Sequence, residues 1–190
     1  ILSLIIPTYN MERYLHYCLD SLLINKNFEA LEVLVINDGS KDNSLAIARS
    51  YEMNYPTVFR VIDKPNGNYG SCINRGLKEA TGKYIKILDA DDSFDTNNFE
   101  EYLSLLLSID VDLILSDIEI VNEQRIRTKY HIYDLPPRSI LKMEDVASLP
   151  TFQYMQMHAV TYRRENLINL GYQQTEGISY TDLQWIFLPM

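Results

Sequence analysis

Short apolar runs alternate with helical patterns through residues 1–116, and this order constrains the fold more than any other feature. The predicted strands are Leu2–Ile6, which is ended by Pro7, Leu31–Ile36, Val58–Ile62, Tyr84–Leu88 and Val111–Ser116. The predicted helices begin at about Met11 and at Asp42 or Asn43, and run from Ser71 to Ala80 and from Asn97 to Leu107. Alternating strands and helices form right-handed crossovers, and continuous apolar strands are buried on both faces. We therefore predict an α/β fold with a mainly parallel sheet flanked by helices.

The pattern changes after Ser116, where apolar and polar residues alternate as in an antiparallel hairpin. The predicted elements there are hairpin strands over 118–122 and 125–133, a strand over 157–162, and helices over 142–149, 163–171 and 181–188. The 190-residue length fits a single domain, in which 117–190 add a smaller antiparallel portion. The chain starts on a strand without Met and stops within an apolar stretch, so we expect a longer, C-terminally truncated protein.

Polar segments follow the predicted strands directly. They are Pro7–Asn10, Asn37–Ser40, Asp63–Lys64 and Asp89–Asp92. The carboxyl ends of parallel strands lie along one rim of the sheet, and ligands bind outside that rim. We therefore expect these four segments to line one site.

The last of these segments carries three carboxylates, Asp89, Asp91 and Asp92. Clustered carboxylates repel one another and lose hydration on burial, so a cluster of them is unfavourable unless another feature compensates. A divalent cation such as Mg²⁺ or Mn²⁺, which takes carboxylate oxygens and shares them with phosphates, is one such feature. A polar turn is the other, because Asp92, Asp95 and Thr96 all suit the N-cap of the next helix.

The composition narrows the class of protein. The formal net charge of −9 argues against nucleic acid as a partner, since nucleic-acid binders present a basic face. The two cysteines lack metal-ligand spacing and fit reduced thiols in a cytoplasmic protein. No apolar run reaches the length of a membrane span, and the first strand lacks the features of a signal peptide.

The sequence resembles the family 2 inverting glycosyltransferases, which have the Rossmann-like nucleotide-diphosphosugar (GT-A) fold. The stretches that carry the resemblance are Ser3–Asn10, Val35–Ser40 with Asp42 and Ser44, Asn74–Tyr84 and Ile87–Asp92. The second half matches more loosely, chiefly at Tyr180–Asp182. The resemblance implies that residues 1–116 bind a nucleotide-sugar and that 117–190 face the acceptor.

At the donor, the resemblance implies a set of nucleotide-binding residues. They are Pro7, Thr8, Tyr9, Asp38, Lys64, Asn68, Asp89 and Ala90. Asp38 would accept a hydrogen bond from the base, which is expected to be uracil. The family often has Arg where this chain has Ile73, and the loop that holds Asn68, with Lys64, is expected to replace its contact.

At the reacting groups, the resemblance implies that Asp91, with Asp89, binds Mn²⁺ or Mg²⁺ and that Asp182 is the catalytic base. An inverting transfer needs one base to take the proton of the acceptor hydroxyl, and a cation to offset the charge of the leaving diphosphate. The sequence offers a carboxylate cluster and one separate carboxylate. The family often reads Glu-Asp at the base, whereas this chain reads Thr181-Asp182.

Other interpretations of the same residues stay open. Asp38 could be an ordinary turn residue, and Asp182 could occupy the first turn of a helix for its stability alone. His158 could form a structural hydrogen bond and have no role beside a phosphate or the acceptor. A non-catalytic nucleotide-sugar binding module would keep Asp38 and Asp91 without needing Asp182. A nucleotidyltransferase would need a Gly-rich basic loop after the first strand, which Pro7–Asn10 lacks.

The resemblance also implies partners. Such enzymes commonly build bacterial cell-surface polysaccharides, so we expect a saccharide or lipid-linked saccharide acceptor. That acceptor would bring the protein into peripheral contact with the inner face of the membrane. The sequence indicates no oligomeric state.

Overall fold

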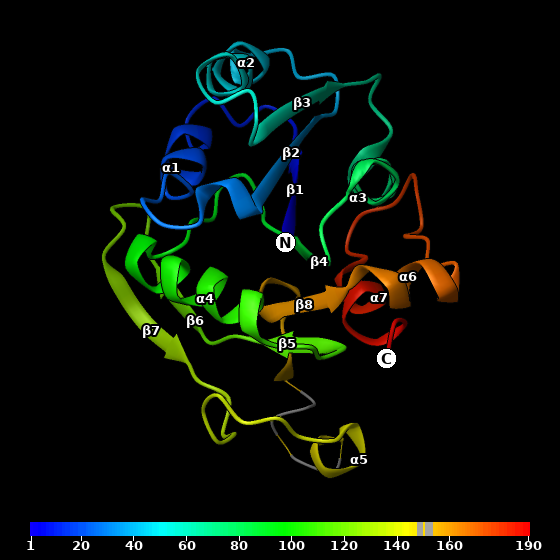
Figure 1. Cartoon of the computed structure of the whole chain (residues 1–190). Helices are drawn as coiled ribbons and strands as arrows, with labels where there is room; N and C mark the ends of the chain where they lie inside the picture. Colours follow the sequence, from blue (N-terminus) through cyan, green and yellow to red (C-terminus); the bar gives the residue numbers. More distant parts are fainter. Residues whose placement is uncertain (148–149, 151–153) are drawn as a thin grey trace.

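The computed structural model describes residues 1–147, 150 and 154–190 (Figure 1). Its main sheet has the strand order β3-β2-β1-β4-β8-β5. These strands are β1 (Leu2–Thr8), β2 (Leu31–Asn37), β3 (Phe59–Asp63), β4 (Tyr84–Ile87), β5 (Leu113–Leu115) and β8 (Val160–Arg163). The pairs β1–β2, β1–β4 and β2–β3 are parallel, and β8 runs antiparallel to both β4 and β5. The predicted α/β fold with a mainly parallel sheet is confirmed.

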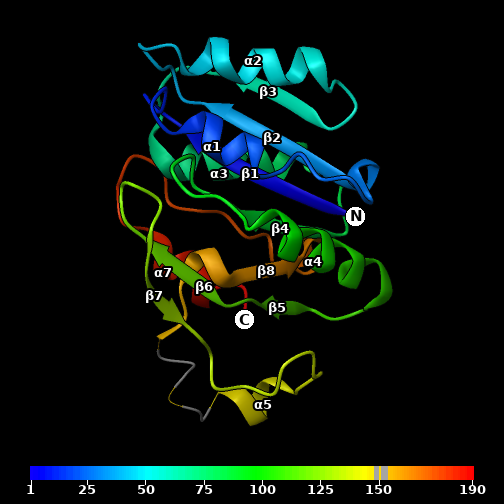
Figure 2. The same cartoon turned by 90° about the vertical axis from the view of Figure 1, so that its left-hand side faces the viewer.

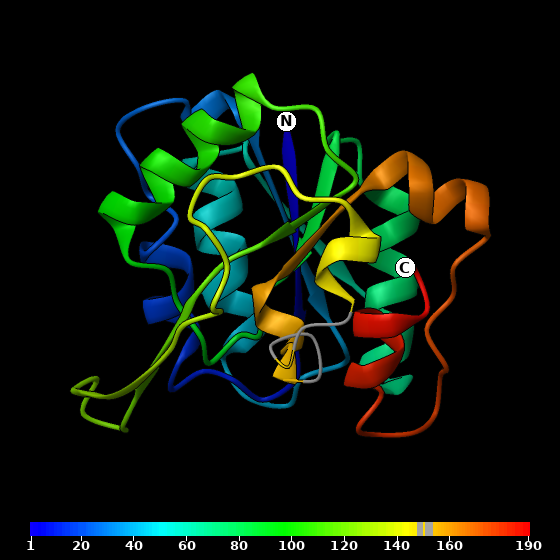
Figure 3. The same cartoon turned by 90° about the horizontal axis from the view of Figure 1, so that it is seen from below.

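Helices cover both faces of this sheet. They are α1 (Leu15–Asp20), α2 (Ser44–Asn54), α3 (Asn68–Glu79), α4 (Thr96–Ser108), α6 (Arg164–Leu170) and α7 (Asp182–Phe187). Alternate residues of β1 enter two separate cores: Leu4 packs with α1, α2 and α4, and Ile5 with α3, α6 and α7. Figure 3 shows the sheet between these two groups of helices. The buried pattern along β1 follows from this double cover, since successive side chains point to opposite faces.

The predicted hairpin forms a separate two-stranded ribbon of β6 (Ile118–Val121) and β7 (Arg127–His131). The short helix α5 (Met143–Val146) follows it and lies beyond β5, at the edge of the molecule opposite β3 (Figures 1 and 2). The helix was predicted over 142–149, and residues 148–149 lie outside the described part of the chain. Within that part, no helix is long and apolar enough to cross a membrane.

Two predicted boundaries near the rim are wrong. The first strand does not end at Pro7 but continues to Thr8. The pairing of β4 with β1 stops at Ile5, so the backbone N–H that Pro7 lacks is not required by β4. The predicted helix at Met11 begins at Leu15, after a turn in which the Met11 carbonyl accepts from the N–H groups of Tyr14 and Leu15.

The third helix begins three residues earlier than predicted, at Asn68 instead of Ser71. Asn68 adopts a left-handed φ of 70°, and its Oδ1 accepts the N–H of Tyr69 at 2.8 Å. Gly70 lies so close to the loop before α7 that a Cβ there would meet the Thr175 carbonyl oxygen at 2.0 Å. The Gly and Asn residues of this stretch predict a loop. In the structure Asn68 instead begins the helix, and Gly70 allows the backbone at Thr175 to come close.

The predicted strand over 157–162 is divided. Residues Met157–Ala159 form a 3₁₀ turn, and β8 follows from Val160. Because β8 runs antiparallel to β4, this turn lies at the carboxyl end of β4. The antiparallel strand therefore adds residues to the rim that the parallel strands form.

Candidate functional site

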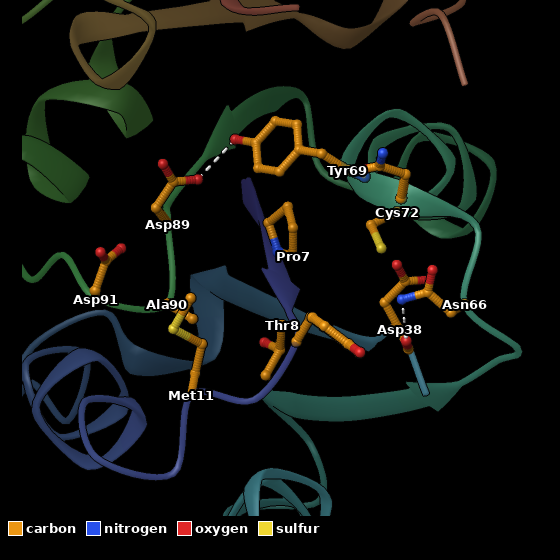
Figure 4. A pocket seen from close by; sticks show the side chains of 12 residues that line it. Pro7, Thr8, Met11, Asp38, Asn66, Tyr69, Cys72, Asp89, Ala90 and Asp91 are labelled. Carbon is orange, nitrogen blue, oxygen red and sulfur yellow. Dashed lines mark hydrogen bonds between the residues drawn. The ribbon is translucent and has the colours of Figure 1, made fainter. Parts of the chain in front are cut away.

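A cavity of about 510 Å³ opens at the carboxyl ends of β1, β2 and β4 and the start of α3 (Figure 4). Its lining residues are Pro7, Thr8, Tyr9, Met11, Asp38, Asn66, Asn68, Tyr69, Cys72, Asp89, Ala90 and Asp91. The structure thus gathers in one cavity every nucleotide-binding residue that the sequence predicts except Lys64, which instead pairs with Asp38. Their roles at a nucleotide stay predictions.

Asp38 lies at one end of this cavity, away from Asp89 and Asp91 (Figure 4). It follows β2, is 2% exposed, and its Oδ1 accepts both from the Lys64 ammonium and, at 2.9 Å, from the N–H of Gly67. Burial, and next the charge of Asp38, raise the pKa of Cys72 to about 12, so this thiol stays neutral beside the carboxylate. Asp38 therefore holds the β3–α3 loop in place and presents a carboxylate to the cavity.

A second acidic group lies beside the cavity, where Asp89, Asp92 and His158 meet. Each offers one ligand atom, and these atoms all lie within 4.8 Å of one another. His158 Nδ1 is 3.3 Å from Asp92 Oδ2 and 3.9 Å from Asp89 Oδ2. Burial raises the pKa of both carboxyl groups.

This group fits a divalent cation. His158 Nδ1 is buried and has no hydrogen-bond partner among the described residues, although it faces two carboxylates. Carboxylate oxygens are the usual ligands of hard cations, and an imidazole extends the set toward transition metals. An orphaned nitrogen beside two acids is the arrangement that a cation would complete.

The three carboxylates of the acidic loop lie in different places. Asp91, the predicted main metal ligand, is exposed and lines the cavity beside this group, and its role at a metal stays a prediction. Asp92, also considered as a helix cap, faces His158 instead, and the cap of α4 is Asp95, which accepts the N–H of Asn98 at 2.9 Å.

The sequence predicts neither His158 nor Asp92 as a main ligand, since His158 suits a structural hydrogen bond and Asp92 a helix cap. Their pairing depends on the antiparallel approach of β8 to β4. Beneath them, the buried Lys86 donates to the His158 carbonyl at 2.5 Å. Burial lowers the pKa of Lys86 to about 7, while the charge of Asp92 acts in the opposite direction.

The tip of the β6–β7 hairpin reaches the same loop. Arg125 donates to Ser93 Oγ at 2.7 Å, and its guanidinium lies 4.4 Å from the centre of the Tyr17 ring. The hairpin tip is thereby attached to α1 and to the turn that follows Asp92. No local sequence pattern indicates this contact, which joins residues that are 32 positions apart.

Asp182, the predicted base, is the first residue of α7 and is exposed. It does not line the cavity, although its charge contributes, after burial and Asp89, to the raised pKa of Tyr69. The preceding Thr181 occupies the N-cap but makes no side-chain cap bond.

A buried amide holds the residue before Asp182. Gln174 is 2% exposed, and its Nε2 donates to the Thr181 carbonyl at 2.6 Å. Asn74 of α3 exchanges two bonds with the Gln174 backbone, at 2.8 and 2.9 Å, and Tyr172 donates to Gln174 Oε1. This network, which the sequence analysis missed, connects α3 to the start of α7.

Comparisons with known proteins agree with this architecture. The model of glycosyl transferase family 2 matches residues 3–171. The uncharacterized glycosyltransferase YibD of Escherichia coli is 32% identical over 193 residues, which cover 97% of this chain and 54% of that protein. The minor teichoic acid biosynthesis protein GgaB of Bacillus subtilis is 39% identical over 104 residues, which cover 54% of this chain and 11% of that protein. The chain thus spans about half the length of YibD.

Two solved structures have the same fold. The crystal structure of S. aureus TarS 1-349 in complex with UDP-GlcNAc has a TM-score of 0.79 at 22% identity and covers 97% of this chain and 52% of that one. The mannosyltransferase PcManGT from Pyrobaculum calidifontis, in complex with GDP-Man and Mn²⁺, has a TM-score of 0.66 at 17% identity and covers 95% of this chain and 49% of that one. With the family model matched over most of its length and the GT-A fold in place, this chain belongs to glycosyl transferase family 2.

Proposed function

We propose that this chain is the catalytic part of a metal-dependent inverting glycosyltransferase, which moves a sugar from a UDP-sugar to a hydroxyl acceptor. Residues 1–116 would bind the donor, and 117–190 would face the acceptor. The observation that carries the proposal is the cavity at the strand ends, with the Asp38 carboxylate at one end and the Asp89–Asp92–His158 group beside the other.

The choice of nucleotide is proposed from the chemistry of Asp38. A buried carboxylate accepts hydrogen bonds and donates none, so it favours a base whose pairing edge carries a ring N–H, such as uracil or guanine. The corresponding ring nitrogen of cytosine is an acceptor, which a carboxylate repels. The similar TarS structure holds a uridine nucleotide-sugar and PcManGT a guanosine one, and both satisfy this requirement.

The residues around the diphosphate are proposed to act together. Asp89, Asp92 and His158 would hold Mn²⁺ or Mg²⁺, which when bound offsets negative charge that develops on the leaving diphosphate. Asp91 lines the cavity beside them and completes an acidic loop that we propose faces the phosphates. Lys86 supports the loop from below through the His158 carbonyl.

Asp182 is proposed to take the proton from the acceptor hydroxyl. Its place at the start of α7, exposed and next to the buried Thr181, leaves the carboxylate open to an acceptor. The name of the relative GgaB supports an acceptor of the teichoic acid or related cell-surface type. A lipid-linked acceptor would place the enzyme at the inner face of the membrane.

One observation favours a second candidate function. Asp182 does not line the donor cavity, and a nucleotide-sugar binding module without catalysis would need no base there. The two candidates differ in whether the sugar is ever released from its nucleotide.

The test is release of UDP from a panel of UDP-sugars, measured with Mn²⁺ and a saccharide acceptor on the wild type, Asp38→Asn and Asp145→Asn. Asp145 is an exposed residue of α5, so its variant is a matched control. We expect turnover of one donor by the wild type and the control, and loss of turnover in Asp38→Asn. Donor binding without turnover in the wild type would favour the binding module.

A further inference from the structure

Tyr69 occupies a position that the proposed reaction does not yet use. It is the second residue of α3, it lines the donor cavity, and its hydroxyl donates to Asp89 Oδ1 at 2.6 Å (Figure 4). The same oxygen lies 3.5 Å from the sulfur of Met157. One phenol therefore touches the segment after β4 and the turn before β8.

The hydrogen bond from Tyr69 gives the two carboxylate oxygens of Asp89 different neighbours. Oδ1 is occupied by the phenol, while Oδ2 is the oxygen that lies 3.9 Å from His158 Nδ1. A carboxylate that is free to rotate could present either oxygen, or both, to a neighbouring cation. Groups that hydrogen-bond to a metal ligand fix its orientation in this way.

We propose that Tyr69 is a positioning residue that holds Asp89 so that only Oδ2 faces Asp92 and His158. The inference rests on the proposed function, because it takes these three residues as the metal site. The contact with Met157 adds to it, since Met157 directly precedes His158 in the chain.

Contacts of the backbone at Tyr69 and Gly70 fix the position from which the Tyr69 side chain extends. The N–H of Tyr69 is bonded to Asn68 Oδ1, and Gly70 packs against the Thr175 carbonyl. The early start of α3 therefore places the phenol at Asp89. A helix that began at Ser71, as the sequence predicts, would not include Tyr69.

The test is the affinity of the chain for Mn²⁺ in the presence of UDP, measured by calorimetric titration of the wild type and Tyr69→Phe. Phe keeps the ring and removes only the hydroxyl. The matched control is Tyr102→Phe, which removes a hydroxyl bonded at 2.7 Å to Thr161 Oγ1 outside the cavity. Tyr69→Met is a second variant, and thermal unfolding without metal verifies that each variant folds.

We expect Mn²⁺ to bind about 10- to 100-fold more weakly to Tyr69→Phe and Tyr69→Met, which is the usual effect of losing such a partner. Tyr102→Phe should match the wild type, and any loss of UDP affinity in the two Tyr69 variants should be larger with Mn²⁺ than without it. Wild-type Mn²⁺ affinity in both Tyr69 variants would overturn the inference and leave the metal site standing. An equal loss of UDP affinity with and without Mn²⁺ would also overturn it. A wild type that binds no Mn²⁺ would refute the metal site and the inference together.

Discussion

The Gln174 network predicts that a residue outside the cavity controls catalysis without controlling donor binding. In Gln174→Met the side chain keeps a similar length but loses both of its hydrogen bonds. The Tyr172 hydroxyl would then lose its acceptor at a site where Gln174 is 2% exposed. The Thr181 carbonyl would lose one of its two donors and keep the N–H of Gln184. Each buried polar group left unsatisfied costs about 1–3 kcal/mol.

We therefore expect Gln174→Met to lower the free energy of unfolding by about 1–3 kcal/mol, the cost of the one polar group that loses its partner. Urea denaturation measures this value directly. The backbone bonds from Asn74 to Gln174 remain in the variant, so the loop should stay on α3 while the Thr181 carbonyl loses its bond from the Gln174 side chain. Sugar transfer should fall, because the proposed base Asp182 follows Thr181 directly.

The matched control is Gln173→Met, the same substitution at the neighbouring exposed residue. It should change the free energy of unfolding by less than about 0.5 kcal/mol, as surface substitutions usually do. UDP affinity should be unchanged in both variants. The reasoning would be refuted if the two variants were equally stable, or if Gln174→Met weakened UDP binding as much as transfer.

Three other substitutions test separate contacts. Gly76→Ala would place a Cβ 2.4 Å from the Ile5 side chain, so we expect urea denaturation to show a loss of about 1–3 kcal/mol from overpacking. Arg125→Ala would detach the hairpin tip from Tyr17, and we expect a small loss, about 0.5–1 kcal/mol, in the same measurement. Asp182→Asn should reduce transfer by about 10²- to 10⁴-fold, the usual contribution of a general base, in an assay of product sugar, with UDP affinity unchanged.

Each of these substitutions has its own contradicting outcome. If Gly76→Ala is as stable as the wild type, α3 is not packed against β1 at the distance described. A large loss of stability in Arg125→Ala would mean that the hairpin tip supports the fold itself. Full transfer activity in Asp182→Asn would remove Asp182 from the mechanism.

The strand ends could be predicted because their signals are local. The apolar run of β1 and the turn residues around Asp38 are continuous in sequence, and parallel strands bring their ends to one rim by rule. The donor cavity is thus largely predictable from residues 1–116. The wrong boundaries there are the end of β1 and the start of α3. Proline and glycine usually end strands and helices, but here Pro7 lies within β1 and Gly70 lies within α3.

The rest of the site depends on pairings that leave no local pattern. His158 reaches Asp92 because β8 is antiparallel to β4, and Gln174 bonds Asn74 across 100 residues. A lone His and a lone Gln carry no periodicity, so their partners appear only in three dimensions. The group that could hold a cation therefore joins Asp89 to Asp92 and His158, whereas the resemblance to the family implied Asp91 with Asp89.

The most direct test of the account is a calorimetric titration of UDP into the chain, with and without Mn²⁺, using the wild type, Asp92→Asn and Asp145→Asn. The account predicts that Mn²⁺ strengthens UDP binding at least about tenfold in the wild type and in Asp145→Asn, and that Asp92→Asn loses this gain. UDP binding that is absent from a folded wild type, or that Mn²⁺ leaves unchanged, would contradict a metal-dependent donor site at these strand ends.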